Sequence, residues 1–253
     1  MHSFFAKLAS YGERYEVTEL PSPTDDEWIG CDRLLDPWSP EMERVLEAER
    51  VASGQVSDHA TALTVMAVYA GTVTASALLA WALEGKVVDV RPANTAIRLS
   101  AHHGFEAVGL RSLSVVEGSV ETAVSWVLTE HLLPLAQAMR VRTRAGLRQL
   151  HGGVAFGCAA AFCAAGRRGA PLDRLEAAYK EFMAVAPGGL DRLGEVVRLA
   201  EGEREGLFYL RNTCCLYYTS AEAVKCASCC LDSVDARLTA YRRTLTTPPV
   251  AHH

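Results

Sequence analysis

The spacing of hydrophobic and polar residues along this chain is helical over much of its length. Over residues 60–83 no charged residue occurs, and Ser and Thr are scattered among Ala, Val and Leu. Ser57 or Asp58 can cap a helix that begins at this point, and Gly85 can end it. The pattern predicts one long helix over 59–84.

A second helix is predicted just before this one. Ser39 followed by Pro40 is typical of a helix N-terminus, because Ser caps the first turn and Pro fits the first helical position. This helix should run to about Ala52. Residues 1–38 are expected to be irregular, since prolines interrupt an acidic stretch there.

Between residues 86 and 116 short β-branched runs replace the helical spacing. The runs are KVVDVRP, TAIRLS, AVGL and SLSVV. Turn residues separate them, and β-branched residues favour strands. We expect three or four strands, paired antiparallel because the connections are too short for crossovers.

Helical spacing returns at Ser119. The predicted helices cover residues 119–140, 144–166, 171–185 and 189–204. Residues 206–218 are expected to be extended, and residues 232–245 to form a final short helix. The whole pattern predicts an α+β fold that is predominantly helical, with a small central antiparallel sheet.

The composition is that of a globular protein with a mild excess of acidic residues. The chain has 253 residues, of which 49% are hydrophobic and 22% are charged, and its net charge is -5. These values give no electrostatic case for nucleic-acid binding. The N-terminus lacks a continuous apolar core, so we expect no signal peptide, a cytoplasmic location and reduced thiols.

The uncharged stretch over residues 60–83 is long enough to span a bilayer. It is only modestly hydrophobic, and neither flank is rich in Lys or Arg. We therefore expect a buried helix rather than a membrane span. Peripheral association with a membrane stays open.

Five of the eight cysteines lie close together near the end of the chain. They are Cys214, Cys215, Cys226, Cys229 and Cys230, in the spacing C-C-x10-C-x2-C followed by one more Cys. Thiolates grouped this closely bind soft or borderline metals. The C-x2-C half recurs in zinc and iron–sulfur sites, because one turn brings both sulfurs to one metal.

The neighbouring cysteines Cys214 and Cys215 help to distinguish a zinc site from an iron–sulfur site. Neighbouring side chains of a strand point to opposite faces, so both sulfurs reach one site only if the backbone kinks. Structural zinc sites usually pair two C-x2-4-C units, whereas the two irons of a [2Fe–2S] cluster separate its ligands. An iron–sulfur cluster is therefore favoured. The alternatives are zinc, or cysteines that stay reduced or form disulfides.

Two cations flank the halves of the cysteine pattern. Arg211 and Lys225 would stabilise the reduced, more negative state of a cluster and raise its reduction potential. The alternative is solvated surface charge. Elsewhere, Cys158 and Cys163 lie on an apolar helix and are expected to be buried free thiols.

The strings R-N-T-C-C-L-Y-Y and K-C-A-S-C resemble the C-terminal signature of FhuF-type ferric-siderophore reductases. The resemblance implies one [2Fe–2S] cluster bound by Cys214, Cys215, Cys226 and Cys229. Cys230 stands where this family often has Pro. The predicted domains are an N-terminal segment (1–56), a FhuF-like siderophore-docking body (57–205) and a C-terminal [2Fe–2S]-binding segment (206–253).

The resemblance also implies a function and partners. A protein of this family would reduce Fe(III) in a siderophore by one electron and release Fe(II) inside the cell. The implied partners are a ferric siderophore, preferably of the hydroxamate type, and an external donor such as a ferredoxin or ferredoxin reductase. No G-x-G-x-x-G nucleotide fingerprint follows a strand. No residue beyond the cluster ligands is expected to be catalytic.

Some features stay open at this point. Chelate contacts are conceivable for several cationic and aromatic residues, although surface or core roles fit each of them better. These residues are Arg144, Arg148, His151, Phe208, Tyr209, Tyr217 and Tyr218. Two other functions remain: a zinc-stapled or non-enzymatic siderophore-binding protein, and an iron–sulfur electron carrier for another partner.

Overall fold

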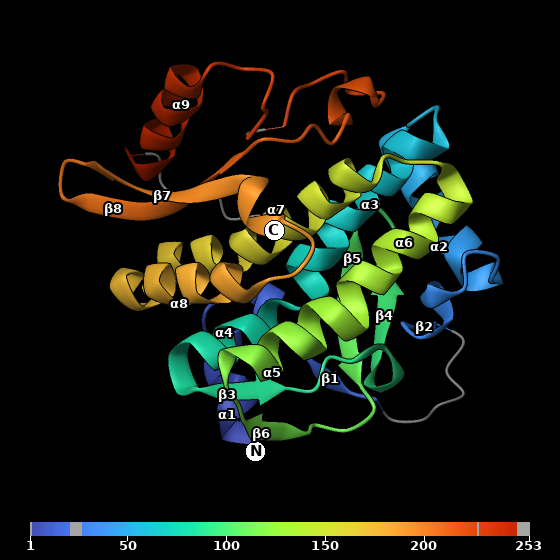
Figure 1. Ribbon diagram of the computed structural model, residues 1–253, viewed down its shortest axis with the longest axis horizontal. Helices are drawn as coiled ribbons and strands as arrows, with labels where there is room; N and C mark the ends of the chain where they lie inside the picture. The colour runs from blue at the N-terminus through green and yellow to red at the C-terminus, as the bar shows by residue number, and fades with distance from the viewer. Residues whose placement is uncertain (1, 21–26, 227, 247–253) are drawn as a thin grey trace.

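The computed structural model describes residues 2–20, 27–226 and 228–246, and Figure 1 shows a helical body with a hairpin and a final helix along one side. The helices are α1 (His2–Ala9), α2 (Pro40–Ser53), α3 (Asp58–Val73), α4 (Ala75–Glu84), α5 (Val120–Val124), α6 (Leu133–Thr143), α7 (Leu147–Arg167), α8 (Leu172–Val185) and α9 (Val234–Thr246). The strands are β1 (Thr18–Glu19), β2 (Trp28–Gly30), β3 (Lys86–Val88), β4 (Thr95–Leu99), β5 (Phe105–Leu110), β6 (Val115–Glu117), β7 (Gly194–Glu201) and β8 (Arg204–Arg211). The predicted α+β fold, mostly helical with small sheets, is confirmed.

The predicted long helix over 59–84 is wrong as a single element, because it breaks at Thr74. Two competing hydrogen bonds explain the break between α3 and α4. The hydroxyl of Thr74 donates to the carbonyl of Ala70 at 2.8 Å, and the guanidinium of Arg14 donates to the carbonyl of Gly71 at 2.8 Å. Both carbonyls belong to the last turn of α3, and side-chain donors of this kind bend helices. Gly85 ends α4 in the left-handed conformation, as predicted.

All four runs between residues 86 and 116 form strands, but they belong to two sheets. Strands β4 and β5 pair antiparallel within a four-stranded sheet of order β1-β5-β4-β2, and β3 pairs antiparallel with β6. The expectation that residues 1–38 are irregular is wrong for the described part, which supplies α1 and two sheet strands, and residues 21–26 lie outside the described residues. The strand β1 pairs in parallel with β5. Both N-terminal strands are too short to show an alternating pattern.

The predicted helices after Ser119 are confirmed as far as α8. The first of them contains a π-helical stretch, Ser125–Leu132, between α5 and α6. Pro134 has no N–H group to donate to the carbonyl of Glu130, which disturbs the regular ladder at this point. The stretch carries His131 into the interior, where the side chain is fully buried.

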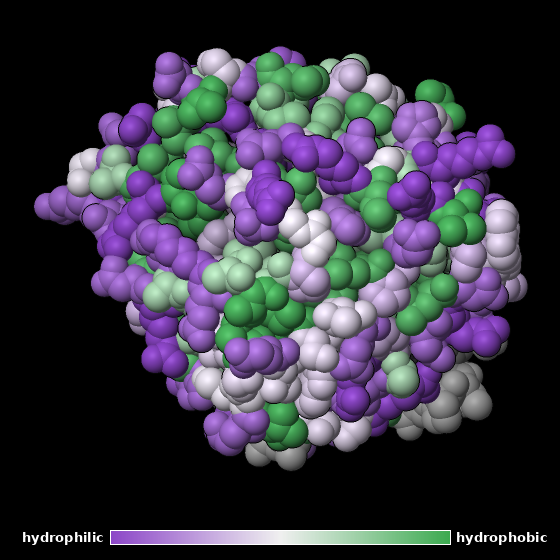
Figure 2. Space-filling model, viewed as in Figure 1, coloured by the Kyte–Doolittle hydropathy of each residue, from purple (hydrophilic) through white to green (hydrophobic). Residues whose placement is uncertain are grey.

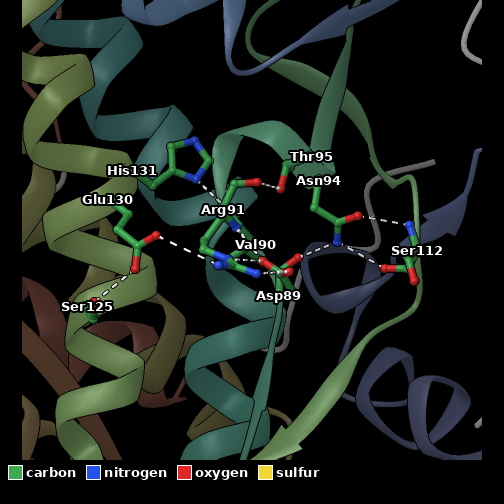
Figure 3. A network of polar contacts seen from close by, with 9 residues as sticks. All are labelled: Asp89, Val90, Arg91, Asn94, Thr95, Ser112, Ser125, Glu130 and His131. Carbon is green, nitrogen blue, oxygen red and sulfur yellow. Dashed lines mark hydrogen bonds and ion pairs between the residues drawn. The ribbon is translucent and has the colours of Figure 1, made fainter.

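His131 closes a chain of buried hydrogen bonds, which we call the histidine cluster (Cys31, Tyr69, Val90 and His131). In Figure 3 its ring points to Val90, and Nδ1 lies 2.5 Å from the Val90 carbonyl oxygen. A carbonyl only accepts, so Nδ1 carries the proton and Nε2 accepts from the Tyr69 hydroxyl at 2.6 Å. Tyr69 is also hydrogen-bonded to Cys31. Burial lowers the pKa of His131 to about 4, so the ring is neutral at pH 7.

The predicted helix over 189–204 is wrong, because these residues form one arm of a hairpin. Strand β7 pairs antiparallel with β8 along its whole length, and Gly202 opens the turn with a φ of 60°. The hairpin carries a small core of its own with α9, made of Leu199, Phe208, Leu210, Tyr241 and Leu245. Figure 2 shows hydrophobic atoms at the surface beside this hairpin, among hydrophilic ones. The predicted domain boundary at residue 205 falls inside β8 and is not tested by these contacts.

Close packing of α3 against α7 forms the centre of the body. A Cβ atom added to Gly157 of α7 would lie 2.5 Å from the backbone nitrogen of Gly71 in α3, so the two helices touch at backbone distance. Nearly all side chains of α3 and α4 are buried, as expected for a buried helix. Within the described residues, no single helix is long and apolar enough to cross a membrane, and only α3 and α4 taken together reach that length and hydropathy.

Candidate metal centre

The cysteine segment, residues 211–231, begins where β8 leaves the hairpin. The backbone N–H of Asn212 donates to the carbonyl of Leu193 at 2.8 Å and ends the strand pairing. The next residue, Thr213, packs against Gly152 of α7 so closely that an added Cβ there would lie 2.6 Å from the Thr213 Cβ. The segment is thereby fixed to the body directly before its cysteine pair.

The backbone turns directly after the vicinal cysteines. Leu216 adopts the left-handed conformation with a φ of 57°, and its N–H donates to the sulfur of Cys214 at 3.4 Å. A left-handed residue breaks the alternation of a strand, so the chain changes direction at this point. At the other half, the N–H of Cys229 donates to the carbonyl of Cys226 at 3.0 Å, which makes the turn expected for C-x2-C.

One sulfur from each half of the pattern lies at the separation of two metal ligands. The sulfurs of Cys215 and Cys226 are 3.6 Å apart. Two thiolates with bonds of about 2.3 Å to one tetrahedral ion lie about 3.7 Å apart. This contact lowers the pKa of Cys215 to about 5 and raises that of Cys226 far above its usual range, because one sulfur stabilises the charge of the other.

Cys214 faces the remaining cysteines. Burial raises the pKa of the Cys214 thiol, and Cys230, Cys215 and Cys229 act on it in the same direction. Cys229 is buried, whereas Cys214, Cys226 and Cys230 are partly exposed. All five thiols thus belong to one electrostatic group with a buried side and an accessible side.

Hydrogen bonds also attach the cysteine segment to the connection between α2 and α3. The N–H of Ala221 donates to the carbonyl of Ser53 at 3.0 Å. The side chain of Gln55 donates to the carbonyl of Leu216 at 3.3 Å and accepts from the hydroxyl of Thr219 at 2.8 Å. These bonds give the cysteine segment a second attachment to the body, in addition to the contact of Thr213 with α7.

An exposed histidine also lies beside the cysteine segment. His103 lies 6.0 Å from the ring of Tyr217, measured between ring centroids, and its Nδ1 is 2.8 Å from a carboxylate oxygen of the buried Glu49. The hydrogen bond to Glu49 raises the pKa of His103. His103 and Glu49 were not predicted as neighbours of the cysteines, since no spacing in the sequence relates them.

Buried donors without partners lie on the cysteine segment and on α9. In the described part of the chain, Nε and Nη2 of Arg211, Nε of Arg237 and the hydroxyls of Thr213 and Ser220 have no hydrogen-bond partner. We call these four residues the arginine cluster. Buried polar groups are normally satisfied, so several open donors together indicate a missing acceptor. Four thiolates on a [2Fe–2S] core carry net negative charge and accept hydrogen bonds at sulfur, so this donor set fits such a group.

The two flanking cations predicted from the sequence differ in environment. Arg211 is buried, with its guanidinium 4.9 Å from the ring centroid of Phe156. Lys225 is exposed and forms an ion pair with Asp232. Of the two, only Arg211 has the buried setting in which a charge acts strongly on a neighbouring group.

The comparison with protein families bears on this segment. Residues 211–231 match the family model of the FhuF 2Fe-2S C-terminal domain. The match contains all five clustered cysteines and Arg211, so the resemblance stated from the sequence is confirmed and an iron–sulfur group is supported. No curated protein matches the chain.

The assignment of individual ligands stays a prediction. In the described residues, no group of three or more His, Cys, Asp or Glu side chains already has metal-binding geometry. Cys214, Cys215, Cys226 and Cys229 remain the predicted ligands of one [2Fe–2S] cluster. Cys230 acts on Cys214 as Cys229 does, so it is the residue to compare with Cys229.

The residues named as conceivable chelate contacts lie in different environments. Phe208 and Tyr209 are buried in the hairpin, and His151 is half-buried with its pKa lowered by burial. Arg144 and Arg148 are exposed around the start of α7, and Tyr217 and Tyr218 lie on the cysteine segment. Arg237 of α9 was missed, because it lies beyond the cysteine pattern on an otherwise ordinary helix.

Proposed function

We propose that this protein passes one electron to Fe(III) in a siderophore and so releases the metal as Fe(II). The observation that carries the proposal is the match of residues 211–231 to the FhuF 2Fe-2S C-terminal domain. The 3.6 Å separation of Cys215 and Cys226, and the open donors of the arginine cluster, support it. A [2Fe–2S] group, when bound, stores and passes a single electron.

The chain's own residues would hold this group and leave one side of it accessible. Cys215 and Cys229 are buried and keep water from their sulfurs, whereas Cys214 and Cys226 are partly exposed. A chelate at the accessible side can approach without entering the protein, and electron transfer needs no covalent bond to it. Hydroxamate and catecholate oxygens are hard ligands that hold Fe(III) more tightly than Fe(II). One electron therefore weakens the complex.

The proposed partners follow from what the sequence lacks and from the substrate's chemistry. No nucleotide fingerprint is present, so the electron should come from a separate donor such as a ferredoxin or ferredoxin reductase. The proposed substrate is a ferric siderophore, of the hydroxamate type in preference to others. Peripheral membrane association is compatible with this role and stays a prediction.

The test begins with anaerobic purification, a visible spectrum, and iron and acid-labile sulfide analysis. We expect coloured protein with about two irons and two sulfides per chain. The reduced protein is then mixed with a ferric hydroxamate in the presence of a ferrous-specific chelator. We expect one Fe(II) per oxidised cluster.

Other results separate the alternatives. Colourless protein with about one zinc per chain would support the zinc-stapled binding protein. If neither ferric hydroxamate nor ferric catecholate oxidises the reduced cluster, the result would support the alternative that the protein is an electron carrier for another partner. A chain that binds neither metal would contradict the iron–sulfur assignment itself.

A further inference from the structure

Two arginine side chains are buried beside the cysteine segment, and among the described residues neither is paired with a carboxylate. Arg211 is 2% exposed and Arg237 is 6% exposed. Within the described residues, three nitrogen donors of these guanidinium groups have no acceptor, and neither group lies in an ion pair. Removing a guanidinium from water is costly unless a negative charge compensates it. These donors therefore indicate a further acceptor, which the described residues do not supply.

Geometry connects the two arginines to each other and to the cysteines. Nη1 of Arg237 donates to the carbonyl oxygen of Arg211 at 2.9 Å. The guanidinium of Arg211 is close enough for its charge to act on the thiols of Cys215 and Cys226. Arg237 thus contacts the backbone of the residue whose side-chain charge acts on the two sulfurs that are 3.6 Å apart.

The helix that carries Arg237 lies against the cysteine segment along one face. Tyr241, one turn after Arg237, donates its hydroxyl to the carbonyl of Tyr209 at 2.8 Å and interacts with Ser228 and Cys226. Residues four apart share one face of a helix. The face of α9 that bears Arg237 is therefore directed toward the cysteine segment.

We propose that Arg211 and Arg237 are positioning residues, whose unpaired N–H groups donate to the sulfur atoms of the bound iron–sulfur group, hold it in the protein and favour its reduced state. The proposal rests on the iron–sulfur function proposed above. Reduction adds a negative charge, and buried cations close by stabilise the more negative state. Without the bound group, the same two charges are uncompensated and destabilise the fold.

The proposal predicts effects of opposite sign in the loaded and the metal-free chain. In the loaded protein, Arg211→Gln and Arg237→Gln should each lower the ratio of reduced to oxidised protein at a fixed potential by at least tenfold. For one electron this is a midpoint potential lower by about 59 mV. Both variants should also lose iron faster to a chelator. In the metal-free chain, the urea midpoint should stay the same or rise.

The chain offers two matched controls. Arg204 donates from Nη1 to the carbonyl of Leu245 at 2.9 Å, so it joins β8 to α9 as Arg237 does, but at the far end of the helix. Lys225 is a cation within the cysteine segment, but it is exposed. Arg204→Gln and Lys225→Gln should keep the wild-type potential and iron content. Arg211→Lys retains the charge, so its midpoint potential should lie between those of Arg211→Gln and wild type. If Arg211→Gln does not fold, Arg211→Lys still tests the role of this residue.

Three results would overturn the proposal. The first is a potential and an iron-release rate of both Arg→Gln variants equal to those of Arg204→Gln. The second is an equal loss of stability in the loaded and metal-free chains, because that marks a purely structural role. The third is wild-type protein that takes up no iron and sulfide, which defeats the proposed function as well. If wild type reduces ferric chelate but the variants match the controls, only the present inference fails.

Discussion

The histidine cluster and the arginine cluster are both buried polar groups, but they differ in how far they are satisfied. In the first, every polar atom has a partner: His131 bonds to Val90 and Tyr69, and Tyr69 bonds to Cys31. In the second, five donor atoms of four residues have none among the described residues. A closed network fixes a core, whereas an open set of donors fits a group that arrives from outside.

The cysteines of the body and those of the cysteine segment also differ, in the pKa values of their thiols. Burial raises the pKa of Cys31, Cys158 and Cys163 to about 12, so these thiols stay protonated and do not offer thiolate ligands. Cys215, with a pKa of about 5, is beside Cys226 and the Arg211 charge. The cysteine segment thus contains a thiol with a lowered pKa, whereas the three buried thiols of the body have raised ones.

The largest expected effect distinguishes these two kinds of cysteine directly. Cys226→Ala should abolish the visible absorption of the anaerobically purified protein, because it removes one sulfur of the 3.6 Å pair. Cys163→Ala, in the core of α7, should keep the full absorption and lose only some stability. The measurement is the spectrum with iron and sulfide analysis. Full colour in the Cys226 variant would refute the ligand assignment.

The next prediction concerns the histidine cluster and the pH dependence of the free energy of unfolding. The pKa of His131 is about 4 in the folded chain and about 6.5 when unfolded, so between these values the unfolded chain binds more protons. The contribution of the neutral ring to stability is therefore complete above pH 6.5 and is lost as the pH falls toward 4. Its full size is about 3 kcal/mol. Urea denaturation of wild type and His131→Gln from pH 7.5 to 5 should show a flatter pH dependence in the variant.

His103 gives the control of opposite sign. Its pKa is raised by the hydrogen bond to Glu49, so its contribution is present at low pH and is lost as the pH rises through the folded pKa. His103→Gln should therefore make the loss of stability toward acid pH steeper than in wild type. Parallel pH profiles for wild type and both variants would mean that neither ring has the environment described.

The cysteine site was more predictable from sequence than its surroundings, and the reason is distance along the chain. The four predicted ligands and Arg211 lie in one short segment, so spacing alone brings them together. Arg237 reaches Arg211 only because α9 folds back onto β8. His103 comes to the same segment from the β4–β5 turn. Contacts of this kind depend on the fold, and no spacing shows them.

The errors in secondary structure have local as well as distant causes. Residues 189–204 were predicted as a helix because their apolar residues fit a helical spacing, whereas Gly202 and the β-branched pair Val196 and Val197 favour a hairpin. The pairing of β7 with β8 decides the outcome, and α9 buries one face of the hairpin. The break at Thr74 likewise depends on Arg14, which lies far away in the sequence.

The smallest expected effect uses two glycines of one helix. In Gly152→Ala the new methyl group would meet the Thr213 side chain directly before the cysteine pair, and in Gly157→Ala it would meet the backbone of α3. Overpacking at either position should cost about 1–3 kcal/mol of unfolding free energy, measured by urea denaturation. Only Gly152→Ala should also lower the iron content, because it displaces the start of the cysteine segment. Equal iron content in both variants would show that the segment holds its metal group independently of its contact with α7, and that the body does not help to position it.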